Sequence, residues 1–149
     1  MTRIRRVLVA TDFSKSSAKA VTGAIDLAKA NRAKLVILHA YVPFVPLVPE
    51  QYLEAGTWDS IDTESRRWAG RQLAKLADRA KKAGVRASSM MVTGDPSSQI
   101  VRVARSQHSD LIVVGTHGRR GFSKFFLGSV AERVIATAGC PVMTVRGAA

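Results

Sequence analysis

Four glycines and three cations lie together in one stretch of the chain. The glycines are Gly115, Gly118, Gly121 and Gly128, and the cations among them are Arg119, Arg120 and Lys124. Glycine lets backbone N–H groups approach an anion closely, and the helix predicted after this stretch offers further unpaired N–H groups at the positive end of its dipole. Most connections between elements run to only about 2 to 6 residues. Because topology does not require so long and glycine-rich a loop, the stretch predicts a phosphate site.

Ser129 has a second interpretation that needs no ligand. Together with Glu132 it forms an S-x-x-E pattern, which predicts a capping box at the start of the last helix. Capping accounts for the serine, but it does not account for the glycines that precede it. The length of the loop and its glycine content therefore favour ligand binding.

The elements that would position this loop alternate strictly between strands and helices. Short apolar runs predict strands at about 6–11, 34–41, 85–92, 111–115 and 141–145. Amphipathic patterns predict helices at about 14–31, 62–83, 96–107 and 129–138. Five strands and four helices in alternation predict an open, doubly wound parallel sheet, in one α/β domain that spans residues 1–149. Such a sheet binds ligands beyond the carboxyl ends of its strands, where the glycine loop lies.

Two segments depart from the regular pattern. Residues 42–49 contain three prolines, which excludes a central strand and predicts a loop. The loop is apolar and is followed by Tyr52, so a lid, a dimer contact and a partner-binding patch all remain open. Arg86 and Ser88 weaken the pattern of the third strand, which predicts a position near an edge of the sheet.

The bulk composition predicts one soluble domain with anionic partners. The chain has 149 residues with a hydrophobic fraction of 46%, which suffices for a core without disulfides, and its single cysteine is Cys140. A lone cysteine, a short apolar run after the basic start and the absence of any run of roughly 20 apolar residues favour the cytoplasm over export or a membrane. The 23 Lys and Arg residues against 11 Asp and Glu give a net charge of +12, which attracts polyanions or serves solubility alone.

The chain resembles the universal stress protein family. The spacing Gly115-x2-Gly118-x9-Gly128-Ser129 matches the nucleotide-binding motif of that family. The resemblance covers nearly the whole chain, because further matching segments occur in the same order: Val7–Asp12, Leu38-His39, Gly94–Pro96, Asp110–Gly115 and Cys140–Val145.

The resemblance implies a Rossmann-like fold of the adenine nucleotide alpha hydrolase type, with a nucleotide across the strand ends. The implied ligand is ATP, with ADP and AMP as alternatives, together with Mg²⁺. The residues that the resemblance assigns to nucleotide binding are Ala10, Thr11, Asp12, Ala40, Val114, Gly115, Gly118, Gly128, Ser129 and Val130. His117 and Arg119 join this set because they lie within the same loop.

Asp12 has two interpretations, and two other positions depart from the family pattern. A carboxylate there could reach a phosphate-bound Mg²⁺, and it could equally cap the helix that begins near Ser14. ATP-binding members often carry proline where Ala10 stands and a hydroxyl residue where Ala131 stands. One lost neutral hydrogen bond is worth about 0.5–1.5 kcal/mol, so weaker phosphate binding is expected.

The function that the resemblance implies is an ATP-binding stress-response or signalling module. ATP would act as a conformational ligand with little or no hydrolysis, because no nucleophile–base pair or metal-ligand spacing assigns a catalytic residue. A homodimer through the strand Pro141–Val145 is also implied. The alternatives are a slow ATPase or phosphotransferase, a nucleotide-free dimeric interaction module, and a basic nucleic-acid-binding protein. The last is disfavoured, since no helix-turn-helix, zinc or RNA-binding aromatic motif is found.

Overall fold

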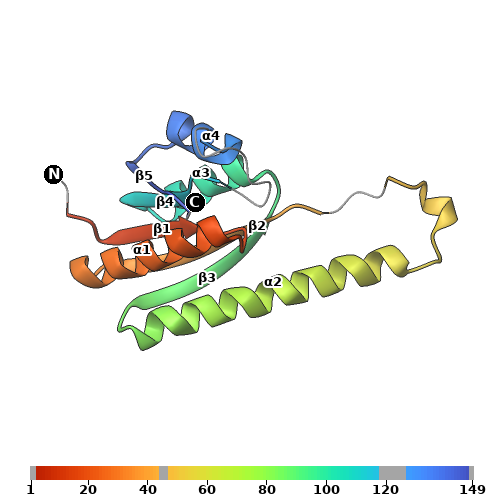
Figure 1. Cartoon of the computed structure of the whole chain (residues 1–149), viewed down its shortest axis with the longest axis horizontal. Coiled ribbons are helices and arrows are strands. Elements are labelled where there is room, and N and C mark those ends of the chain that lie inside the picture. The colour runs from red at the N-terminus through yellow and green to blue at the C-terminus, as the bar shows by residue number, and fades with distance from the viewer. Residues whose placement is uncertain (1–2, 44–46, 118–126, 148–149) are drawn as a thin grey trace.

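A five-stranded parallel sheet with helices on both faces forms the body of the molecule (Figure 1). The computed structural model describes residues 3–43, 47–117 and 127–147. The strands are β1 (Arg6–Ala10), β2 (Lys34–Tyr41), β3 (Arg86–Thr93), β4 (Leu111–Gly115) and β5 (Val142–Val145), in the order β3-β2-β1-β4-β5. The predicted doubly wound α/β fold is therefore confirmed, as is the edge position of β3. Strand order reverses between β1 and β4, which is where such sheets bind ligands.

Two helices cover each face of the sheet (Figure 1). They are α1 (Lys15–Asn31) and α2 (Thr57–Lys82) on one face, and α3 (Pro96–Ser106) and α4 (Ser129–Thr137) on the other. A short 3₁₀ helix, η1 (Glu50–Tyr52), lies between β2 and α2. Among the described residues, no helix combines the length and the apolar character that crossing a bilayer requires.

The central strands bury both of their faces. Val7 and Val9 pack with α1 and α2 in one core cluster, whereas Leu8 packs with α3 and α4 in the other. All three side chains are completely buried. Successive side chains of a strand point to opposite faces, so a strand between two helical layers must be apolar at every position. This requirement explains why β1 and β4 are continuous apolar runs.

Helix α2 begins at Thr57, several residues before the predicted start near 62, so that boundary was wrong. Its N-cap is Gly56, which has a φ of 83° and makes no side-chain capping bond. The buried residues of α2 begin only at Ala69, because its first turns project beyond the sheet (Figure 1). These first turns do not contact the sheet and therefore need no apolar stripe. The predicted start of the helix rested on such a stripe, so the first turns were missed.

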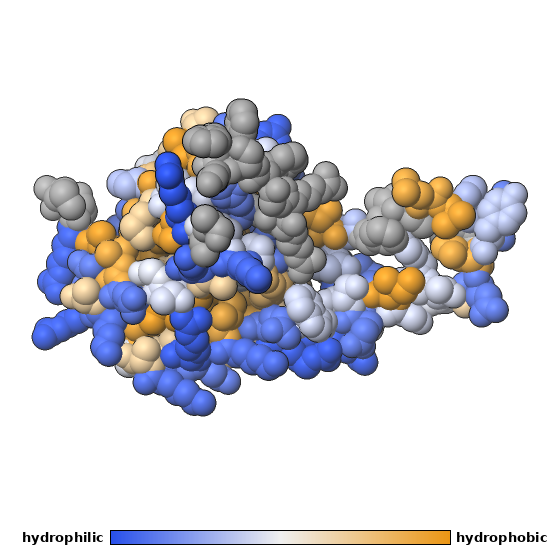
Figure 2. All heavy atoms as spheres, viewed as in Figure 1, coloured by the Kyte–Doolittle hydropathy of each residue, from blue (hydrophilic) through white to orange (hydrophobic). Residues whose placement is uncertain are grey.

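The connection from β2 to α2 forms an arm that extends away from the sheet (Figure 1). Residues 44–46 of the predicted apolar loop lie outside the described residues. On the described part, Leu47 is 101% exposed and Tyr52 is 73% exposed. Ile61 and Trp68 of α2 are exposed as well, and apolar side chains are visible over the arm in Figure 2. The apolar side chains in the described part of this segment are thus exposed and are not part of the core of the domain.

Helix α3 begins with a strong N-cap. The carboxylate of Asp95 accepts hydrogen bonds from the backbone N–H of Ser98 at 3.0 Å and from the hydroxyl groups of Ser97 at 2.7 Å and Ser98 at 2.9 Å. Pro96 occupies the first helical position, where its missing N–H costs nothing. The bond from Ser97, followed by the two from Ser98, lowers the pKa of the Asp95 carboxyl group to about 2.

Replacement of Asp95 by alanine is expected to destabilise the fold by about 1 kcal/mol at neutral pH. Because the folded-state pKa of Asp95 is about 2 and lies below the ordinary value of 3.8, the extra stability of the ionised cap is present above pH 3.8. This stability is lost as the pH falls through about 2. Denaturant unfolding of the wild type and of Asp95→Ala at several pH values measures the difference. Asp95→Asn, which caps without ionising, serves as control, and a wild-type advantage over alanine that persists unchanged at the lowest pH would contradict the assignment.

Candidate functional site

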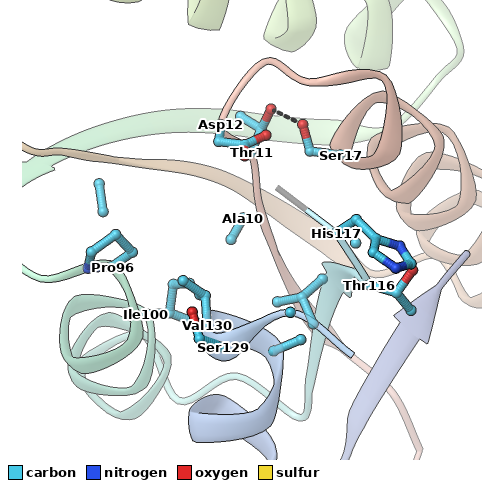
Figure 3. Close-up of a pocket in the computed structure, with 15 residues that line it drawn as sticks. Ala10, Thr11, Asp12, Ser17, Pro96, Ile100, Thr116, His117, Ser129 and Val130 are labelled. Carbon is cyan, nitrogen blue, oxygen red and sulfur yellow. Dashed lines mark hydrogen bonds between the residues drawn. The ribbon is translucent and has the colours of Figure 1, made fainter. Parts of the chain in front are cut away.

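A cavity of about 280 Å³ opens at the carboxyl ends of β1 and β4 (Figure 3). Its volume is near the lower end of the range for small-molecule pockets. Every predicted site residue in the described part of the chain lines it: Ala10, Thr11, Asp12, Ala40, Val114, Gly115, His117, Gly128, Ser129 and Val130. Gly118 and Arg119 lie outside the described residues. The reversal of strand order has therefore brought segments from four parts of the chain to one place.

Five lining residues were not predicted as site residues, and most of them build the apolar part of the wall. They are Ser17, Pro96, Ile100, Thr116 and Ala131. Ile100 and Ala131 are each 2% exposed and pack in the same core cluster as Val114. Such a surface suits a flat aromatic base. The Asp95-Pro96 start of a helix at the carboxyl end of a strand was the available sequence signal for α3.

Thr11 and Asp12 form a turn between β1 and α1 that their own side chains hold. The hydroxyl of Thr11 lies 3.0 Å from the Ser17 hydroxyl and accepts a bond from the backbone N–H of Phe13 at 3.0 Å. The carboxylate of Asp12 accepts the N–H of Ser14 at 3.0 Å. Phe13 has a φ of 64°, which is uncommon for a residue other than glycine. The turn is therefore fixed before any ligand arrives.

The helix cap that was one interpretation of Asp12 is supplied by Ser14. The N-cap of α1 is Ser14, whose hydroxyl accepts the N–H of Ser17 at 3.2 Å. Asp12 supports the cap residue from outside the helix and is one of the residues that line the cavity (Figure 3). An oxygen ligand of this kind suits a phosphate-bound Mg²⁺, which proteins usually hold through one or two carboxylates.

Two of the motif glycines are needed for close backbone contacts. A Cβ atom on Gly115 would lie 2.7 Å from the Ser16 hydroxyl oxygen and 3.1 Å from the Ser16 carbonyl carbon. A Cβ atom on Gly128 would lie 2.9 Å from the carbonyl oxygen of Thr116. That carbonyl accepts the N–H of Gly128 at 2.6 Å and so joins the two ends of the glycine loop. Part of the glycine content is thus required by close packing, whatever ligand the loop binds.

The predicted capping box at Ser129 is wrong. The N-cap of α4 is Gly128, no side chain caps it among the described residues, and Ser129 is the first helical residue. The N–H of Glu132 bonds to the carbonyl of Gly128 at 3.0 Å. The bond from Gly128 to Thr116 fixes the backbone there, and the helix consequently starts one residue after the glycine. Ser129 is exposed and its side chain lines the cavity (Figure 3).

The two histidines beside the cavity have structural contacts. Nδ1 of His39 lies 2.8 Å from the carbonyl oxygen of Thr11, and its ring tilts against Phe13 at 4.6 Å. The N–H of His117 donates to the Ser16 hydroxyl at 3.3 Å, and its Nδ1 lies 2.9 Å from the Thr116 hydroxyl. No group of three or more His, Cys, Asp or Glu side chains that could hold a metal occurs among the described residues.

Phe13 also joins the turn to helix α2. Its ring meets Trp68 edge to face, with the ring centroids 5.2 Å apart. The same phenylalanine therefore contacts His39 on the sheet and Trp68 on the helix that covers it.

The start of α4 is the part of the cavity that favours an anion. Pro96 and Ser129, the first residues of α3 and α4, both line the cavity. The N-terminus of a helix carries roughly half a positive charge and unpaired N–H groups. At α3 the ionised Asp95 already caps this terminus, whereas no side chain among the described residues caps α4. Asp12 is the acidic residue of the described wall, so the cavity can hold an apolar ring on one side and a phosphate at the start of α4.

Comparison with known proteins gives one consistent family. The model of the universal stress protein family matches residues 3–146. A universal stress protein of Methanocaldococcus jannaschii is 35% identical over 144 residues, which cover 95% of this chain and 82% of that protein. Among solved structures, the universal stress protein UspA of Lactobacillus plantarum superimposes with a TM-score of 0.85 at 21% identity, over 98% of this chain and all of that one.

Ligand complexes occur among the similar structures, and one of them is 31% identical to this chain. It is a universal stress protein in complex with cAMP, with a TM-score of 0.71, covering 97% of this chain and 98% of that chain. The match to the family model and the identity over almost the whole length lead to one conclusion. The chain belongs to the universal stress protein family.

Proposed function

We propose that the chain acts as a single domain that binds an adenine nucleotide in the cavity at the ends of β1 and β4. The observation that carries the proposal is the composition of the cavity wall, which joins an apolar surface to the N-terminus of α4, which no side chain among the described residues caps. The relative in complex with cAMP supports the choice of an adenine nucleotide. The base would lie against Ile100, Val114 and Ala131, and the phosphates would lie toward Ser129 at the start of α4.

The proposed physiological ligand is ATP with Mg²⁺, and ADP and AMP are the alternatives. Asp12 would bind the metal that the phosphates hold, because it is a carboxylate residue among those that line the cavity. ATP is proposed to act as a conformational ligand with little or no hydrolysis, in a cytoplasmic stress or signalling protein. A slow ATPase is the alternative, and it requires a group that orients water at the γ-phosphate.

We also propose a homodimer through the free edge of β5. Pro141 and Val145 of the predicted strand direct their carbonyl groups to β4, where they accept the N–H groups of Ile112 at 3.0 Å and Thr116 at 3.0 Å. Because bonding directions alternate along a strand, the backbone of Thr144 points to the open side. An unpaired edge of this kind can pair with a second copy.

Isothermal titration with Mg-ATP and with AMP tests the nucleotide site. Ala40→Phe is expected to abolish binding, since a benzyl group at this lining position fills the cavity. Ser129→Ala is expected to weaken Mg-ATP binding by roughly 2- to 13-fold, which corresponds to one neutral hydrogen bond of about 0.5–1.5 kcal/mol. Ser89→Ala is the matched control, because Ser89 is an exposed serine on β3 that does not line the cavity. Circular dichroism confirms folding, and undiminished binding by a folded Ala40→Phe would refute the site.

The dimer is tested by light scattering coupled to size exclusion. The wild type is expected at twice the mass of the chain, and Thr144→Pro is expected as a monomer, because proline removes the N–H that points to the open edge. Thr144→Val, which keeps the N–H, is the control and should remain dimeric. A monomeric wild type, or a dimer that survives Thr144→Pro, would refute an interface through β5.

A further inference from the structure

A row of cations lies where the strands begin, at the end of the sheet opposite the cavity. We call this end the basic edge. Strands β1, β2 and β3 begin at Arg6, Lys34 and Arg86, and these residues are direct partners in the sheet register. All three are exposed. Neighbouring strands lie about 4.8 Å apart, and like charges placed opposite each other on adjacent strands repel. The row is therefore a local concentration of positive charge that folding itself does not favour.

Three hollows meet around this row. Their volumes are about 650, 310 and 300 Å³, and Arg86 lines all three. Five further cations line one or more of them: Arg3, Arg5, Lys29, Arg32 and Lys81. No acidic side chain of the described residues lines any of the three. Hydrophilic side chains are visible in Figure 2 at the end of the molecule where β1 begins. The hollows form a continuous basic edge, and the largest of them exceeds the nucleotide cavity in volume.

The protein neutralises only part of this charge. Arg6 donates to the carbonyl of Gln107 at 3.0 Å, and Arg86 donates to the carbonyl of Arg32 at 3.1 Å. Each helix C-terminus supplies roughly half a negative charge, so the ends of α1, α2 and α3 give about 1.5 charges. Asp110 adds one carboxylate, which already accepts the N–H groups of Arg5 and Arg6 at 2.8 and 2.9 Å. The three cations of the row and the five further ones make eight in all. None of these eight forms an ion pair among the described residues.

A buried hydroxyl group beside the largest hollow has no partner. Ser109 lines that hollow and is 9% exposed, and its hydroxyl makes no hydrogen bond among the described residues. Buried polar groups in native proteins are nearly always paired, so an unpaired one requires an explanation. Ser109 is itself part of the lining of the largest hollow, so its hydroxyl group lies close to the space that a ligand would occupy. The hydroxyl is an observation independent of the charge, and it points to a ligand with acceptor oxygens.

The lining favours a chain of phosphates without bases. Guanidinium groups bind phosphate oxygens in pairs, which suits the arginine-rich edge. No aromatic side chain of the described residues lines the hollows, whereas single-stranded nucleic acids stack their bases on aromatic side chains. The edge consists of strand starts and helix ends, so it offers no helix face to enter a DNA groove. We propose that this basic edge binds linear inorganic polyphosphate, independently of the nucleotide cavity at the other end of the strands.

The proposal is tested by titrating the full-length protein with long-chain sodium polyphosphate at several NaCl concentrations. Saturable binding is expected, with log K falling linearly as log salt rises. The double variant Arg5→Gln/Lys34→Gln removes two edge cations whose side chains make no bond within the described structure. It is expected to weaken binding by about tenfold or more and to make the salt slope shallower by about 2, one for each cation.

A charge-matched control separates this site from net charge alone. Arg67→Gln/Lys75→Gln removes two exposed cations from the outer face of α2, and it should leave polyphosphate binding close to that of the wild type. Equal losses in the two double variants would overturn the site. Ser109→Ala should weaken binding several-fold, and unchanged affinity would overturn the part assigned to its hydroxyl.

Two competition experiments test which polyanion the basic edge binds and whether polyphosphate binds there or in the nucleotide cavity. Saturating AMP should not displace polyphosphate, because the cavity and the basic edge lie at opposite ends of the strands. Displacement by AMP would place polyphosphate in the nucleotide cavity and overturn the proposal, without affecting the nucleotide site itself. A single-stranded oligonucleotide with the same number of phosphates should bind more weakly. If it binds as tightly, and Arg5→Gln/Lys34→Gln abolishes that binding, the edge is a nucleic-acid surface and the polyphosphate assignment fails.

Discussion

The common direction of the five strands determines the chemistry at both ends of this molecule. Helices α1, α3 and α4 start close to the ends of parallel strands, so the carboxyl ends of the strands gather helix N-termini, whereas α2 starts on the projecting arm. Pro96 and Ser129 reach the cavity for this reason. The amino edge gathers helix C-termini and strand starts, where Arg6 and Lys34 stand side by side. Two sites with different lining, one apolar with helix starts and one rich in arginine, follow from a single topological constraint.

Within the carboxyl edge, one serine holds the two halves of the cavity in contact. Ser16, which is 8% exposed in the first turn of α1, lies so close to Gly115 that a Cβ atom there would be 2.7 Å from its hydroxyl oxygen. A Cβ atom on Gly147, beyond β5, would be 3.1 Å from the Cβ of Ser16. The same hydroxyl accepts the N–H of His117. The half of the site that follows β1 is thereby fixed against the half that follows β4.

The sequence predicted the buried elements best. The predicted bounds of β2 and β4 agree with the structure, because a strand covered on both faces is a continuous apolar run that ends abruptly. The start of α2 was missed, since its first turns bury nothing and carry no pattern. The capping box at Ser129 failed because the bond between Gly128 and Thr116 is a contact that local sequence does not contain. Ile100 reaches the cavity through packing between layers, and its spacing resembles that of any other core residue.

The contact between Phe13 and Trp68 also bears on the intrinsic fluorescence of this protein. The chain contains two tryptophans. Trp68 lies edge to face with Phe13, the residue that follows Asp12 in the turn at the cavity mouth. Trp58 lies in the first turn of α2, which belongs to the projecting arm. Intrinsic fluorescence therefore has two separate sources, one beside the turn at the cavity mouth and one on the arm, and single replacement of either tryptophan by phenylalanine separates their emission.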